Sequence, residues 1–116
     1  MRPDDYSDVF RDRQGEPCGI DRFEQIARDE NLRHIGADIV ASSRGLLYVS
    51  TIWTGVDMSL FSRRPLIFET MTCDRSGKYL DEYSGRWETL LAATIMHRRI
   101  VEKAAQSWWS NLGGLA

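Results

Sequence analysis

Hydrophobic residues recur with a helical period in two segments of the chain. In residues 20–28 the apolar side chains stand at i, i+3, i+6 and i+7, which predicts a short amphipathic helix. A broader apolar stripe runs from Leu90 to about Ser107, and Thr89 precedes it as a suitable N-cap. Because so wide a stripe is typical of a helix that packs over a sheet, we expect a sheet between the two segments.

Several other apolar segments are rich in β-branched and aromatic residues, and they predict strands. These segments are Tyr6–Phe10, Leu32–Ala41, Leu46–Gly55, Leu66–Cys73 and Tyr79–Trp87. Ser42–Gly45 is typical of a hairpin between antiparallel strands. In the strand after it, the even-numbered residues from Tyr48 to Thr54 should face opposite to the odd-numbered residues from Leu47 to Trp53.

This order of elements predicts an α+β fold. We expect an antiparallel sheet of about four to five strands, with a short N-terminal helix and a long C-terminal helix packed on one face. At 116 residues the chain is expected to form a single domain, residues 1–116. The glycines near its end predict a loose tail from about residue 108.

Composition and charge exclude several classes of protein. The chain has 15 basic and 17 acidic residues, so its net charge of −2 argues against bulk nucleic-acid binding. No apolar run reaches the length of a membrane span, and the acidic N-terminus does not look like a signal peptide, so we expect a cytoplasmic protein. Cys18 and Cys73 are expected to be reduced thiols. His34 and His97 stand too far apart for typical zinc-ligand spacing, so neither a metal nor a cofactor is expected.

Four residues around one loop form a candidate ligand site. Trp53 precedes the loop, Asp57 lies within it, and Arg63 and Arg64 end it. An indole beside two guanidinium groups could stack on a flat ring and hold an anion. The alternative is structural, because an Asp at this point often caps its own loop.

Two further features are candidate binding elements. Glu69 lies in the middle of a predicted strand, where it could be solvated, pair with Arg86 across the sheet, or contact a ligand. Trp108 and Trp109 place a large apolar surface near the C-terminus, which is more typical of a subunit interface or of docking onto the core than of a ligand site.

Catalytic signatures are scarce. The sequence contains no G-x-S-x-G elbow, no Walker A loop and no G-x-G-x-x-G. His97 lies on the apolar stripe of the long helix, where a buried, hydrogen-bonded histidine is more common than a proton-transfer residue. An enzymatic site would need a cleft that joins His97 to Glu69 or Asp57, and we expect no catalytic residues.

Two motifs, together with shorter flanking segments, carry a family resemblance. Val49–Asp57 (VSTIWTGVD) and Pro65–Met71 (PLIFETM) resemble a widespread family of small bacteriophage and prophage proteins. The chain departs from that family at Met58, where the family has His, and at residues 59–64, where it has a Gly-rich loop. The resemblance implies a phage origin and a role in neutralising host factors.

The leading hypothesis is therefore a non-enzymatic phage accessory protein that binds a host protein or a nucleotide-type signal, as a homo-oligomer. In the nucleotide version, Trp53 stacks on a base. Phosphate contacts would come from Arg63, Arg64 or Arg86, and ribose contacts from Asp57 or Glu69. The alternatives are a self-assembling structural protein that uses Trp108, Trp109 and a sheet edge, and a small hydrolase.

Overall fold

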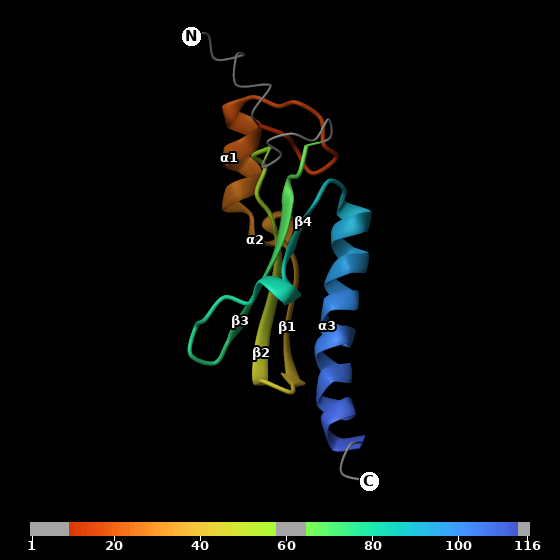
Figure 1. Cartoon of the computed structure of the whole chain (residues 1–116). Helices are drawn as coiled ribbons and strands as arrows, with labels where there is room; N and C mark the ends of the chain where they lie inside the picture. The colour runs from red at the N-terminus through yellow and green to blue at the C-terminus, as the bar shows by residue number, and fades with distance from the viewer. Residues whose placement is uncertain (1–9, 58–64, 114–116) are drawn as a thin grey trace.

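Within the described part of the chain, four strands form one antiparallel sheet in the order β1-β2-β3-β4 (Figure 1). The computed structural model describes residues 10–57 and 65–113. Its elements are α1 (Ile20–Arg28), α2 (Glu30–Arg33), β1 (His34–Ser42), β2 (Gly45–Trp53), β3 (Phe68–Asp74), the 3-10 turn η2 (Asp81–Tyr83), β4 (Gly85–Trp87) and α3 (Leu90–Gly113). The predicted α+β fold is confirmed.

Local sequence signals account for several boundaries. Ser42 and Gly45 close the β1–β2 hairpin, where the Ser42 hydroxyl donates to the Gly45 carbonyl at 2.8 Å and Gly45 has a φ of +90°. That φ lies in the left-handed region that favours glycine. At the start of α3, the Thr89 hydroxyl accepts a hydrogen bond from the Ala92 amide at 3.0 Å, as expected of an N-cap.

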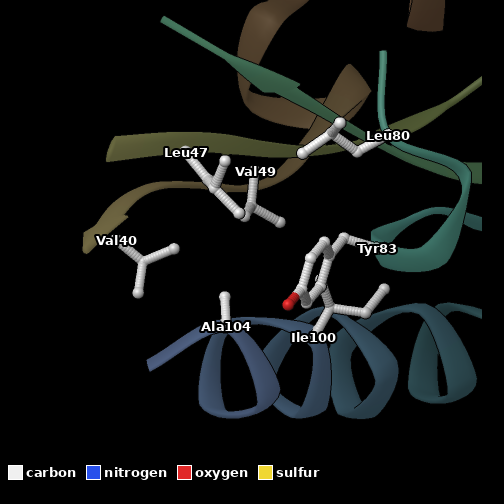
Figure 2. Close-up of a cluster of buried hydrophobic side chains, with 7 residues drawn as sticks. All are labelled: Val40, Leu47, Val49, Leu80, Tyr83, Ile100 and Ala104. Carbon is white, nitrogen blue, oxygen red and sulfur yellow. The ribbon is translucent and has the colours of Figure 1, made fainter. Parts of the chain in front are cut away.

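The predicted alternation in β2 is confirmed, and α3 covers the side that carries the odd-numbered residues. Figure 2 shows a hydrophobic cluster between the sheet and α3, with side chains of the sheet pointing towards the helix. The buried residues of this cluster are Val40, Leu47, Val49, Leu80, Tyr83, Ile100 and Ala104. We call the side of the sheet that faces α3 the inner face and the opposite side the outer face.

A second buried cluster lies towards the α1 end of the sheet. It contains Ile26 of α1, Trp53, Ile67, Phe68 and Ala93 of α3. The inner-face residues Trp53 and Phe68 are register partners in β2 and β3. The short N-terminal helix therefore contributes to the same side of the core as the long helix.

Three predicted boundaries are wrong. Helix α3 continues through Trp108 and Trp109 to Gly113, so the loose tail from about residue 108 is corrected to a continuous helix. Leu32 lies in α2 because the Asp29 side chain accepts a hydrogen bond from the Asn31 amide and caps an additional helical turn.

The expected strand at residues 79–87 is divided into a bridge at Tyr79, the turn η2 and the short strand β4. Hydrogen bonds within the turn explain this: the Ser84 hydroxyl donates to the Leu80 carbonyl and accepts from the Thr72 amide. The expected strand at residues 6–10 lies outside the described residues except for Phe10, which bridges to Val56.

Candidate functional site

A row of four small residues crosses the inner face between the two hydrophobic clusters. Gly36, Thr51, Thr70 and Gly85 are successive register partners on β1, β2, β3 and β4. Both threonines are fully buried. The row places two hydroxyl groups in the core, and each needs a hydrogen-bond partner there.

The two glycines leave room for the rings that provide these partners. A Cβ atom at Gly36 would lie 2.8 Å from His97 Nε2, and one at Gly85 would lie 2.5 Å from the Trp87 ring. His97 from α3 and Trp87 from β4 therefore occupy the space above the glycines. We call these two rings, with Thr51, Thr70 and Asp38, the polar layer.

The side chains of the polar layer form one continuous hydrogen-bonded chain. Trp87 Nε1 lies 2.9 Å from Thr70 Oγ1, and the two threonine hydroxyls are 2.5 Å apart. Thr51 Oγ1 lies 2.7 Å from His97 Nδ1, and His97 Nε2 lies 2.6 Å from Asp38 Oδ2.

One arrangement of protons satisfies every atom in the chain. In this arrangement the Asp38 carboxylate accepts from Nε2–H of His97, and Nδ1 acts as the acceptor. The Thr51 hydroxyl donates to Nδ1 and accepts from the Thr70 hydroxyl, which in turn accepts from the Trp87 N–H. Each threonine hydroxyl both donates and accepts, whereas the Trp87 N–H only donates and the Asp38 carboxylate only accepts. The chain therefore links α3 to all four strands and leaves none of its own buried polar atoms unpaired.

Asp38, His97 and Thr51 resemble an acid–base–nucleophile triad in composition, but their positions do not suit nucleophilic catalysis. The nucleophile of a triad must reach the substrate, whereas Thr51 is 0% exposed. Both nitrogens of His97 are also occupied, and the ring is 8% exposed. His97 hydrogen-bonds to Thr51 and Asp38, and not to Glu69 or Asp57, the acids that an enzymatic site was expected to use. The Asp38 side chain is 53% exposed, and with His97 it lines a cavity of about 640 Å³ between α3 and β1.

Asp38, Thr51 and Thr70 were not among the site residues predicted from the sequence. A signal was present for Thr51, since it occupies a core-facing position of β2 between Val49 and Trp53. It was weaker for Thr70, because two of the three buried positions of β3 are threonines. Asp38 carried no such signal, because its partner His97 lies 59 residues further along the chain.

Trp53 is buried and does not form the predicted stacking platform for a base. It is 2% exposed, and its ring packs against Phe23 with centroids 5.3 Å apart. With both hydrophobic faces inside the core, Trp53 cannot stack on a base from solvent. This part of the predicted ligand site is corrected.

Asp57 has, in part, the structural role that was the alternative to ligand binding, in which the residue caps its own loop. Its Oδ1 accepts a hydrogen bond from the Leu66 amide at 3.2 Å, which ties the start of the loop to its end. Arg63 and Arg64, the predicted phosphate contacts, lie outside the described residues.

Glu69 and Arg86 are directly paired across β3 and β4, one of the alternatives expected for Glu69. Arg86 Nε lies 3.0 Å from Glu69 Oε2. Both side chains lie on the outer face, opposite to Trp53, so the structure does not bring the predicted ligand residues into one site. Glu69 and Arg86 line a pocket of about 510 Å³ on the outer face. The other residues that line it are Leu66, Tyr79, Asp81, Ser84 and Gly85.

The outer face of the sheet carries large apolar side chains that α3 does not cover. Ile39, Tyr48, Cys73 and Tyr79 follow one another as register partners across the sheet. We define the outer-sheet patch as Ile39, Leu46, Tyr48, Met71 and Tyr79, which are 40% to 65% exposed. A pocket lined mostly by Ala37, Ile39, Tyr48 and Ser50 lies within it.

Trp108 and Trp109, the predicted interface residues, lie in the last turns of α3. Trp109 is 66% exposed and Trp108 is 37% exposed, and their rings meet edge to face with centroids 5.1 Å apart. Both indoles therefore offer surface to a partner, although on a helix and not on a tail.

The remaining candidate chemistry is limited. Cys18 and Cys73 are free thiols, and burial raises the pKa of Cys18, with a smaller contribution from the Asp12 carboxylate. Among the residues that the structure describes, no group of three or more His, Cys, Asp or Glu side chains could hold a metal ion. No helix in the described ranges has both the length and the apolar character needed to cross a membrane.

Comparison of the chain with family models, with curated proteins and with solved structures gives no match. Function is therefore inferred from the site geometry and, for a phage origin, from the two sequence motifs.

Proposed function

We propose that this chain is a non-enzymatic binding protein and that the outer-sheet patch binds a partner protein. The observation that carries the proposal is the exposure of five large apolar side chains together on the sheet face opposite to α3. Exposed apolar surface of this kind, with polar groups beside it, is typical of protein–protein contact sites.

A negative charge next to the patch favours a partner that carries a basic side chain. The pocket at the β3–β4 end contains the carboxylates of Glu69 and Asp81 but the guanidinium of Arg86 alone. Because Arg86 pairs with Glu69, the pocket keeps one excess negative charge from Asp81. A partner that presents an apolar surface flanked by a Lys or Arg side chain complements both features.

A protein ligand is better supported than a nucleotide. The nucleotide version requires Trp53 as a stacking platform and Arg86 as a phosphate contact. Trp53 lies in the core, and the charge of Arg86 is balanced by Glu69.

The biological setting is part of the proposal. On the two motifs that resemble phage proteins, we infer that the chain is a phage accessory protein that acts in the bacterial cytoplasm and neutralises a host protein by binding it. The absence of an accessible nucleophile in the polar layer supports a binding role over a hydrolytic one.

The test begins with a photo-crosslinking amino acid at Ser50, which lies between Tyr48 and Ile52 on the outer face of β2. Crosslinked host protein from an infected bacterium is identified by mass spectrometry, purified, and titrated into the chain by calorimetry. We expect Met71→Glu to weaken this binding at least tenfold, because it places a charge within the apolar patch. Asp81→Asn should weaken it about three- to tenfold, because it removes the excess charge.

The matched control is Ile20→Glu, since Ile20 is 37% exposed on α1 and Met71 is 40% exposed. Ile20→Glu should leave the affinity unchanged, and the melting temperatures should show that all three variants fold. Equal binding by the wild type and Met71→Glu would overturn the proposal. So would a nucleotide that co-purifies with the chain and binds in calorimetry while no protein does.

A further inference from the structure

The side of α3 that points away from the sheet carries a second stripe of residues. Its members are Leu91, Ile95, Arg98, Glu102, Ala105 and Trp109, at alternating spacings of four and three. Ala105 lies at the edge of the stripe, where it is half-buried and also packs against the inner-face cluster. This is the spacing of a seam between two paired helices. Leu91 and Trp109 are 70% and 66% exposed, and Figure 1 shows no described element on this side of α3.

The order of residues in this seam is the same from both ends. Leu91 and Trp109 lie equally far from residue 100, as do Ile95 and Ala105, and as do Arg98 and Glu102. If two copies of α3 pair antiparallel about a two-fold axis near residue 100, each apolar side chain meets an apolar one. Each Arg98 then meets a Glu102 of the other copy.

The two central charges are available for such a contact. Arg98 and Glu102 are exposed, and within residues 10–57 and 65–113 neither forms an ion pair. Together with Thr94, Ile95 and Arg99 they line a groove of about 280 Å³ along α3, and they also line the cavity of about 640 Å³ between α3 and β1. In a parallel pair, by contrast, Arg98 would face Arg98 and Glu102 would face Glu102.

We propose that α3 is a dimerisation surface whose partner is a second copy of this chain, paired antiparallel along this seam. The contact is isologous, as a two-fold axis requires. The seam from Leu91 to Trp109 is about 27 Å long, which corresponds to an interface near the lower end of specific ones, about 1,000 Å². We therefore expect a reversible, concentration-dependent dimer.

The seam and the outer-sheet patch lie on opposite sides of the molecule, because α3 covers the inner face. A dimer built along α3 would keep both patches open and present two copies of the proposed protein-binding site. The dimer itself is argued from α3 alone and does not depend on the proposed function.

Sedimentation analysis over a range of concentrations tests the dimer by comparing the wild type with variants in which the charges at positions 98 and 102 are reversed. In the Arg98→Glu variant a carboxylate at position 98 faces Glu102 of the other copy. In the Glu102→Arg variant a guanidinium at position 102 faces Arg98 of the other copy. Each variant alone should need at least a tenfold higher concentration to dimerise. The double variant R98E/E102R should dimerise as the wild type does, and an equimolar mixture of the two single variants should form a heterodimer.

The control is Arg75→Glu, the same charge reversal at an exposed position in the turn after β3, which should leave the dimer unchanged. Melting temperatures verify that each variant folds, as exposed helical positions predict. A wild type that stays monomeric at millimolar concentration would contradict the proposal. The same holds if the single variants dimerise like the wild type, or if the double variant does not recover.

Discussion

The imidazole of His97 occupies the space that a side chain at Gly36 would need. A Cβ atom at Gly36 would lie 2.8 Å from Nε2 and 2.9 Å from Cε1 of the ring. We expect Gly36→Ala to lower the free energy of unfolding by about 1–3 kcal/mol, because His97 must move and its hydrogen bonds to Asp38 and Thr51 are strained. Urea unfolding of the variant measures this loss.

Gly19→Ala is the matched control, since a Cβ atom at Gly19 would meet nothing within 4 Å. Its cost should stay below about 1 kcal/mol, which reflects only the preference for glycine over alanine at the N-cap of α1. In a chain that already carries His97→Ala, the Gly36→Ala substitution should cost much less than in the wild type. Equal costs in the two backgrounds would show that His97 is not the cause.

Thr51 tests the hydrogen bonds of the polar layer separately from its packing. Thr51→Val keeps the shape of the side chain but removes the donor to His97 Nδ1 and the acceptor for Thr70. Because two buried polar atoms then lose their partner, we expect a loss of about 1–3 kcal/mol in the free energy of unfolding. Thr94→Val, on the exposed side of α3, should change it by less than about 0.5 kcal/mol. If urea unfolding gives equal losses for the two variants, the polar layer is not stabilising.

The parts of the fold that depend on local periodicity could be predicted from the sequence. The bounds of α1, the N-cap at Thr89 and the alternation along β2 are all set by residues within a few positions of one another. The wrong boundaries follow from contacts that periodicity does not report. The Asp29 cap of α2 and the hydrogen bonds of Ser84 within η2 are examples.

The candidate site was harder to predict because it depends on which face of the sheet α3 covers. Alternation placed Trp53 and Glu69 on strands correctly but did not show that Trp53 lies on the inner face and Glu69 on the outer face. Asp38 and His97 meet only through the register of β1 with β2 and the packing of α3. Neither is visible in a single sequence.

The Glu69–Arg86 pair should contribute little to stability. Arg86 is 48% exposed and Glu69 is 19% exposed as side chains, so water screens their attraction. A double-mutant cycle with Glu69→Gln and Arg86→Gln should give a coupling energy of about 0.2–1 kcal/mol, which falls as salt rises. The more exposed Arg44–Glu82 pair, with side chains 49% and 44% exposed, should couple less strongly. A Glu69–Arg86 coupling that does not change with salt would contradict this picture.

Asp74 in the turn after β3 should titrate at lower pH than an ordinary aspartate. The Ser76 hydroxyl donates to Asp74 Oδ1 at 2.6 Å, and the amides of Ser76 and Lys78 donate to the same oxygen at 2.9 Å. These bonds stabilise the carboxylate and lower the pKa of Asp74, with the Ser76 hydroxyl as the largest cause. Because the folded pKa lies below the unfolded one, the turn is fully stabilised above the ordinary pKa of aspartate, and this stabilisation is lost as the pH falls through the folded pKa.

Carboxyl-carbon NMR titration measures the pKa of Asp74 directly. Ser76→Ala should raise it towards the ordinary value, because the strongest donor is removed while the backbone donors remain. The control Ser110→Ala, on α3, should leave it unchanged. An Asp74 that titrates at or above its ordinary pKa in the wild type, or that does not respond to Ser76→Ala, would show that the hydrogen bonds of this turn do not hold the carboxylate in its charged form.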